Sequence, residues 1–115
     1  MNKLKYKDIA AQRQQMLALQ NNCCGLCLEP IQDDAVLDHD HRTGELRMVL
    51  HRGCNALLGK IENNMPRNRI DINRLRTLAS NLVDYIQTRH TDIVHPRHRI
   101  KQPKARRTKR ANTQS

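Results

Sequence analysis

Two short pairs of Cys and His residues stand out as potential metal ligands. They are Cys24-Gly-Leu-Cys27 and His51-Arg-Gly-Cys54, each with two residues between its members. A two-residue gap lets one tight turn direct both side chains at a single ion, and two such turns supply the four soft ligands of a closed tetrahedral zinc site. Because a closed site has no open coordination position, we expect this zinc to stabilise the fold and not to perform chemistry.

Other uses of these cysteines remain open from the sequence. Cys23 could replace Cys24 through a three-residue gap, or it is a spare thiol. The cysteines could also be reduced core residues beside an unrelated His51. Disulfides are disfavoured because the N-terminus lacks the apolar region of a signal peptide, and the reducing cytosol favours thiolate ligation of metal. We therefore expect a cytoplasmic protein.

A second group of polar side chains lies between the two pairs. Asp38-His39-Asp40-His41 is followed by Arg42-Thr43-Gly44, and Asn55 directly follows the last zinc ligand. An alternating Asp-His run is disfavoured by charge repulsion unless a cation is present, so it indicates a divalent metal. In isolation, His39 would be interpreted as a turn histidine. An alternative for Asn55 is the N-cap of a short helix, a role that is compatible with metal binding.

The charge is strongly basic and unevenly distributed. The chain has 21 Lys and Arg against 11 Asp and Glu, a net charge of +10, and residues 96–115 contain no acid. Such a segment cannot bury a core and is attracted to polyanions, which predicts a flexible tail that binds nucleic acid. No apolar run approaches the roughly 18 residues of a membrane span. The basic residues of the tail are Arg97, Arg99, Lys101, Lys104, Arg106, Arg107, Lys109 and Arg110.

The elements that must hold these residues follow from periodicity. A first helix is predicted over residues 6–19, ending near Asn21-Asn22, because Asn tolerates the left-handed conformation that closes helices. Residues 35–37 and 46–50 are β-prone and predict a hairpin, with Gly44 supplying a positive φ in its turn. The pattern then becomes helical at residues 56–58, where Gly59 is expected to stop or bend the helix.

A second long helix is predicted from Asp71, as N-cap, to about Thr88, with apolar residues at steps of three and four. Its stripe could pack on the first helix or on a second subunit. The sequence contains no Phe or Trp, so the apolar core is small and a metal or a partner chain is expected to support the fold.

The ordered motifs resemble a known family. Their order is similar to that of the phage recombination endonuclease VII family, within the His-Me finger (HNH-like) nucleases. The motifs are Cys-x-x-Cys, then Asp-His-Asp-His with a nearby Thr-Gly, an apolar strand, and a ligand pair ending in Cys-Asn. The resemblance covers about residues 12–62. It implies an α+β fold: a small zinc-stapled ββα-metal core flanked by helices, with a disordered basic tail.

The resemblance also implies a reaction. His39, at the end of the first strand, would be the general base that activates water, and Asp38 and Asn55 would hold one Mg²⁺ or Mn²⁺ against the scissile phosphate. His41 would line the site and orient the phosphate or assist the metal. Arg42 and Arg47 are either phosphate contacts or solvated surface charges.

Two departures from the family pattern are visible. The family usually has Cys where this chain has His51, which still gives a sound Cys₃His site. A Glu often follows the Asn on the nuclease helix of the family, whereas Leu57 and Leu58 occupy that stretch here.

The resemblance thus implies an endonuclease that acts on branched or distorted DNA, or a nicking enzyme. Paired cutting would require two active sites, hence a possible homodimer through the helices. The alternative is a catalytically silent zinc module that binds DNA or a host protein. We expect residues 1–62 to hold the first helix and the nuclease core, residues 63–92 an amphipathic helix for packing or dimerisation, and residues 93–115 the tail.

Overall fold

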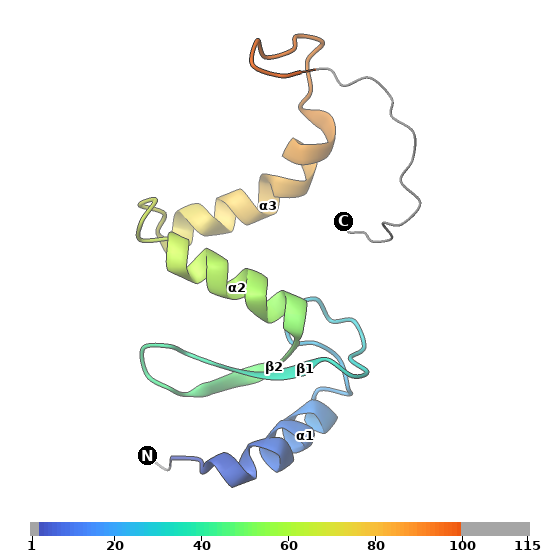
Figure 1. Ribbon diagram of the computed structural model, residues 1–115, viewed down its shortest axis with the longest axis vertical. Coiled ribbons are helices and arrows are strands. Elements are labelled where there is room, and N and C mark those ends of the chain that lie inside the picture. The colour runs from blue at the N-terminus through green and yellow to red at the C-terminus, as the bar shows by residue number, and fades with distance from the viewer. Residues whose placement is uncertain (1–2, 100–115) are drawn as a thin grey trace. The chain divides into compact units, whose positions relative to one another are not determined.

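The computed structural model describes residues 3–99 (Figure 1). The chain divides into two compact units, Met1–Leu75 and Arg76–Ser115. The predicted α+β class is confirmed, and none of the described helices is long and apolar enough to cross a membrane. Most of the predicted basic tail, from residue 100 onward, lies outside the described residues. The elements are a 3₁₀ helix η1 (Tyr6–Asp8), α1 (Ile9–Leu19), β1 (Ala35–His39), β2 (Leu46–His51), α2 (Arg52–Asn64) and α3 (Ile72–Thr88).

The first helix ends as predicted. Asn21 and Asn22 both adopt the left-handed conformation, with φ of 57° and 61°. The backbone N–H of Asn22 donates to the carbonyl of Leu17 at 2.9 Å, which satisfies one of the last carbonyls of the helix. The chain is thereby turned toward the first cysteine pair immediately after α1.

β1 and β2 form the predicted antiparallel hairpin, and Gly44 in its turn has a φ of +82°. Val36 pairs with Leu50 and Leu37 with Val49, but His39 then pairs with Leu46. The register shift means that two residues of β2, Arg47 and Met48, lie opposite Asp38 alone, which is a β-bulge. The strict alternation of side chains along β2 is broken at this point.

The hairpin lies between two helices. Both α1 and α2 contact β1 and β2, and they cover opposite faces of the hairpin, as Figure 1 illustrates. The small core at the centre consists of Cys24, Ile31, Val49 and Leu50. One of these four buried side chains is a candidate metal ligand, as expected for a fold with few large apolar residues.

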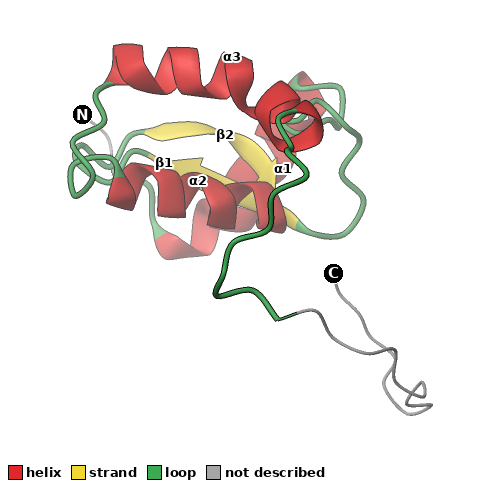
Figure 2. Cartoon of the chain, turned by 90° about the horizontal axis from the view of Figure 1, so that it is seen from above, coloured by secondary structure: helices red, strands yellow, loops and turns green. Residues whose placement is uncertain are grey.

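The helix that follows β2 differs from the prediction. α2 begins at Arg52, with His51 as its N-cap, and runs without interruption past Gly59 to Asn64 (Figure 2). The predicted stop or bend at Gly59 was wrong, because the cost of about 1 kcal/mol for a helical glycine is offset where the helix packs on the core through Leu58. Asn55 lies inside the helix, so the N-cap interpretation of this residue was also wrong.

The second long helix has the predicted N-terminus. Asp71 precedes α3, and its Oδ1 accepts a hydrogen bond from the backbone N–H of Arg74 at 2.8 Å. Several apolar side chains of α3 are exposed, among them Val83, Tyr85 and Ile86.

Candidate metal centre and nuclease site

The first cysteine pair lies on a tight loop after α1. The backbone N–H of Cys24 donates to the carbonyl of Glu29, and the N–H of Leu28 donates to the carbonyl of Cys24, at 2.9 and 3.0 Å. The N–H of Gly25 donates to the carbonyl of Val49 at 3.0 Å, which fastens this loop to the outer edge of β2. The loop therefore presents the Cys24 and Cys27 thiols beside the end of the hairpin.

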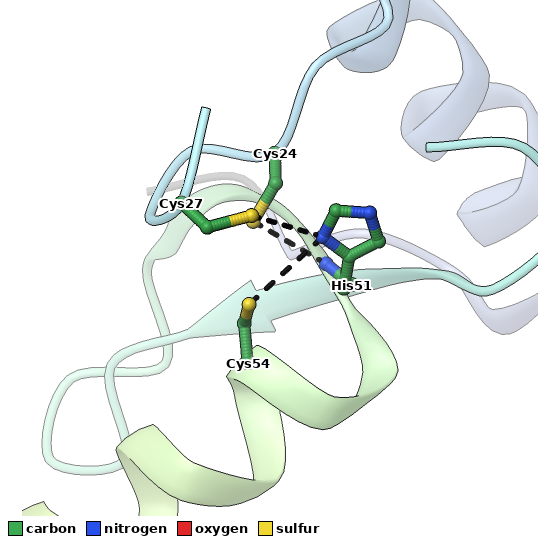
Figure 3. Close-up of side chains that lie close together, drawn as sticks. All are labelled: Cys24, Cys27, His51 and Cys54. Atoms are coloured by element: carbon green, nitrogen blue, oxygen red, sulfur yellow. Dashed lines mark hydrogen bonds between the residues drawn. The ribbon is translucent and has the colours of Figure 1, made fainter. Parts of the chain in front are cut away.

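The second pair lies at the junction of β2 and α2. His51 is the last residue of β2, and Cys54 is in the first turn of α2. The four side chains converge, as Figure 3 shows, and their ligand atoms all lie within 4.8 Å of one another. Three sulfurs and one nitrogen form a donor set of structural zinc sites, so the predicted Cys₃His cluster is formed and suits a structural zinc.

The two nitrogens of the His51 ring have different partners. Nδ1 lies 3.2 Å from the sulfur of Cys27 and 3.9 Å from that of Cys54, whereas Nε2 lies 2.9 Å from the carbonyl oxygen of Pro30. When Nε2–H donates to the carbonyl of Pro30, Nδ1 carries the lone pair and faces the sulfurs. Nδ1 is therefore the nitrogen that would bind zinc. The hydrogen bond to Pro30 raises the pKa of His51 to about 9.

The pKa values of two of the thiols are shifted in opposite directions. Burial raises the pKa of Cys24, but hydrogen bonds from the backbone amides of Cys27, His51 and Leu26 outweigh this effect and lower the pKa to about 6. Burial raises the pKa of Cys54 to about 11. Cys23 does not join the cluster, since its thiol faces the carbonyl of Asn21 at 3.5 Å. The alternative in which Cys23 replaces Cys24 is therefore wrong.

Asp38 lies on the α2 side of the hairpin and is held by Arg47. Nε of Arg47 donates to Oδ2 at 2.7 Å, and Nη2 donates to Oδ1 at 3.2 Å. The other edge of the same guanidinium donates to Glu62 of α2, at 2.7 Å from Nη1 and 3.2 Å from Nη2. These bonds, to Glu62 first and then to Asp38, raise the pKa of Arg47 further above its usual value, so it stays charged.

His39 ends β1, and its side chain lies on the opposite side of the hairpin from that of Asp38, as expected for adjacent residues of a strand. The structure therefore does not bring the His39 ring to the Asp38 carboxylate. It is exposed and lines an open hollow of about 440 Å³ with Lys3, Tyr6 and Leu46. Its ring lies 4.9 Å from that of His41 between centroids, at a tilt of 40°. The structure thus brings the two histidines together at the end of the hairpin.

The loop between the strands has an internal support. Oδ1 of Asp40 accepts hydrogen bonds from the backbone N–H groups of Arg42 and Thr43, at 2.7 and 3.2 Å. These bonds lower the pKa of Asp40. Asp40 therefore shapes the turn, which is the usual role of an Asx residue in a loop.

A second open hollow, of about 360 Å³, lies between this loop and the end of α2. His41, Arg42 and Glu62 are among its lining residues.

Asn55 is partly exposed on α2, and its side chain makes no hydrogen bond with the part of the chain that the structure describes. Of the predicted tail contacts, Arg97 and Arg99 are exposed, and the others lie outside the described residues.

Sequence reasoning missed Glu62 and the internal pairing of Arg47. Glu62 lies seven residues after Asn55, about two turns later on a similar face of α2, so the helical repeat indicates it only if the helix continues past Gly59. Arg47 was treated only as a phosphate contact or a surface charge. Its pairing with Asp38 depends on the bulge in β2, which no periodicity reveals.

A family model described as recombination endonuclease VII matches residues 1–88. No curated protein matches the chain significantly. The matched segment extends beyond the motifs at residues 12–62 to include all of α3. Because it covers well over half of the sequence and contains both ligand pairs, the chain belongs to the recombination endonuclease VII family, a family of endonucleases.

Proposed function

We propose that the protein is a metal-dependent DNA endonuclease of the His-Me finger type, which hydrolyses phosphodiester bonds in branched or otherwise distorted DNA. The observation that carries this proposal is the ββα unit, in which His39 ends β1 and Asn55 follows the zinc cluster on α2. Family membership supports the nuclease activity, and the family description, which names recombination, supports the branched substrate.

His39 is the proposed general base. Its ring is exposed at the end of β1 and beside an open hollow, where a water molecule and a phosphodiester can approach. A neutral imidazole accepts a proton from water as the oxygen attacks phosphorus. For His41, whose ring lies 4.9 Å away, the proposed role is to orient the phosphate.

Asp38 and Asn55 are the proposed ligands of a catalytic divalent ion. A carboxylate and an amide oxygen are the hard donors that Mg²⁺ and Mn²⁺ prefer, so this donor set fits either ion. When bound, the ion would stabilise the negative charge that develops on the phosphate and on the leaving oxygen. Asp38 contributes a nearly buried carboxylate, with 7% of its side chain exposed.

DNA contacts are proposed for Arg42, beside the hollow that contains His41, and for the basic residues of the tail between Arg97 and Arg110. Lys and Arg bind phosphates without reading sequence, so affinity should fall steeply with salt. Cutting two strands of a junction would need two sites, and the exposed apolar side chains of α3 support a homodimer through this helix.

The rival function is a catalytically silent zinc module that binds DNA or a host protein. The zinc cluster and the net charge of +10 fit it equally well. It provides no reason for the exposed His39–His41 pair, so we favour the nuclease.

A cutting assay tests the choice. The protein is incubated with supercoiled plasmid and with a four-way junction, in Mg²⁺, Mn²⁺ or EDTA. The variant His39→Ala is assayed in parallel. The control is His90→Ala, which changes an exposed histidine after α3. We expect metal-dependent cutting by wild type and His90→Ala, and a loss of at least about a hundredfold in His39→Ala. Equal cutting by all three proteins, or none with any metal, would refute the nuclease.

A further inference from the structure

Arg47 bridges two carboxylates from different elements. Four hydrogen bonds join its guanidinium to both oxygens of Asp38 on β1 and to both oxygens of Glu62 on α2. Since an arginine has five N–H groups, this use leaves little of Arg47 for an external phosphate. The arrangement is partly shielded from water, with 33% of the Arg47 side chain and 37% of the Glu62 side chain exposed.

The bulge in β2 makes this bridge possible. In a regular ladder only Met48 would lie opposite Asp38, and Arg47 would face the other side of the hairpin. With the bulge, Arg47 and Met48 both line the hollow that contains Asp38 and Leu58. A bulge re-aims a side chain at the cost of regular pairing, so Arg47 is directed at Asp38 by the backbone itself.

We propose that Arg47 and Glu62 are positioning residues for the carboxylate of Asp38, with Glu62 also keeping the site attractive to a divalent cation. This inference rests on the proposed role of Asp38 as a metal ligand. Arg47 fixes the orientation of the Asp38 carboxylate through two donors. Alone it would also cancel the charge of Asp38, leaving a neutral pair with little attraction for a cation.

Glu62 resolves this conflict between orientation and charge. The group of Asp38, Arg47 and Glu62 carries a net charge of −1, the same as Asp38 alone, while the carboxylate of Asp38 is held in place. Glu62 also lines the hollow beside His41, where an unpaired carboxylate would repel phosphate. Its pairing with Arg47 reduces that repulsion.

Metal binding measured apart from cutting tests the inference. Mn²⁺ is titrated into the zinc-loaded full chain, and free Mn²⁺ is followed by electron paramagnetic resonance; kcat for junction cutting is measured at saturating Mn²⁺. The variants are Glu62→Gln, Arg47→Gln, the double variant and Asp38→Asn. Zinc content and thermal unfolding establish that each variant is folded, and Glu62→Asp and Arg47→Lys serve as charge-preserving substitutes.

The expected shifts have opposite signs. Glu62→Gln should raise the Kd for Mn²⁺ by about three- to tenfold, and Arg47→Gln should lower it by a similar factor, while reducing kcat by roughly tenfold. The double variant, which restores the net charge of −1, should return Kd to near the wild-type value and leave kcat low. Each charge-preserving substitute should have a Kd near that of wild type.

A purely structural bridge predicts a different pattern. Glu62→Gln and Arg47→Gln would then lower thermal stability and weaken Mn²⁺ binding alike, or leave binding unchanged, and either result overturns the inference. If wild type binds Mn²⁺ and Asp38→Asn binds it equally well, the proposed metal ligand is wrong and the inference falls with it. If Asp38→Asn loses Mn²⁺ binding while Glu62→Gln and Arg47→Gln bind it as wild type does, Asp38 remains the proposed metal ligand. That result overturns only the inference about Arg47 and Glu62.

Discussion

The imidazole of His51 is oriented by the backbone carbonyl of Pro30, whose oxygen lies 2.9 Å from Nε2. The bond spans 21 residues and joins the end of β2 to the loop that follows the first cysteine pair. It places Nδ1 toward the sulfurs of Cys27 and Cys54. A contact outside the cluster therefore favours the tautomer in which Nδ1 is free to bind a metal.

The first prediction concerns the ligand set. Cys27→Ser should lose stoichiometric zinc, because a hydroxyl is a poor ligand for this ion. Cys23→Ser should keep one zinc per chain, since Cys23 lies outside the cluster. Elemental analysis of the purified proteins measures both. A wild-type protein without stoichiometric zinc, or equal zinc in the two variants, would contradict the assignment.

The second prediction concerns removal of the zinc. The cluster joins the first cysteine loop to the β2–α2 junction, so we expect a chelator of zinc to unfold the site and abolish cutting even in abundant Mg²⁺. Circular dichroism and junction cutting are followed during titration with a zinc-selective chelator. Re-addition of zinc should restore both signals together, whereas cutting that persists in the zinc-free protein would argue against the coupling.

The sequence predicted those parts of the fold that depend on local chemistry. Asn21 and Asn22 could be recognised as a helix end, Gly44 as a turn and Asp71 as an N-cap, because each reflects an intrinsic backbone preference. The Cys₃His cluster was predictable because the gap of two residues within each ligand pair is a local feature of the sequence.

The parts that were missed depend on tertiary contacts. Gly59 does not end α2, because packing of the helix outweighs the preference of a single residue. The pairing of Arg47 with Asp38 and Glu62 requires a bulge in β2, and a register shift leaves no trace in hydrophobic periodicity. Glu62 could be placed on the face of Asn55 only once α2 was known to continue past Gly59.

The third prediction concerns Gly25 in the first cysteine loop. A Cβ at this position would lie 2.8 Å from Cβ and Sδ of Met48, closer than real atoms approach. Gly25→Ala should therefore lower the free energy of unfolding by about 1–3 kcal/mol. Gly53→Ala is the matched control, since nothing lies within 4 Å and α2 continues through this position, so it should be neutral or slightly stabilising. Denaturant unfolding of the zinc-loaded proteins compares them, and equal stability would count against the close approach.

The fourth prediction concerns Gln20, whose side-chain amide pairs with the backbone of β2. Its Nε2 donates to the carbonyl of Val49 and its Oε1 accepts from the N–H of Val49, both at 2.9 Å. Because Val49 is fully buried, Gln20→Ala leaves its N–H unsatisfied and should cost about 1–3 kcal/mol. Gln15→Ala, on an exposed position of α1, is the control and should be nearly neutral. The unfolding midpoint in urea distinguishes them, and a neutral Gln20→Ala would argue against the contact.

The fifth prediction separates the roles of the two aspartates in the Asp-His-Asp-His run. The side-chain oxygen of Asp40 supports the turn by accepting from two backbone N–H groups, and an Asn oxygen can accept the same bonds. Asp40→Asn should therefore preserve cutting, Asp40→Ala should lower the thermal midpoint, and Asp38→Asn should abolish cutting. Cutting assays and thermal unfolding of the three variants measure these effects.

The pH dependence of Asp40 gives an independent check. Hydrogen bonds to the carboxylate of Asp40 lower its pKa in the folded protein. The stability that these bonds contribute is therefore fully present when the pH is above the pKa of the unfolded chain. It is lost as the pH falls through the lower pKa of the folded protein. Asp40→Asn cannot titrate at this position and should lose less stability than wild type over that acidic range. If the two proteins lose stability in parallel, the carboxylate does not support the turn in its charged form. If Asp40→Asn stops cutting while its turn is intact, Asp40 has a chemical role as well.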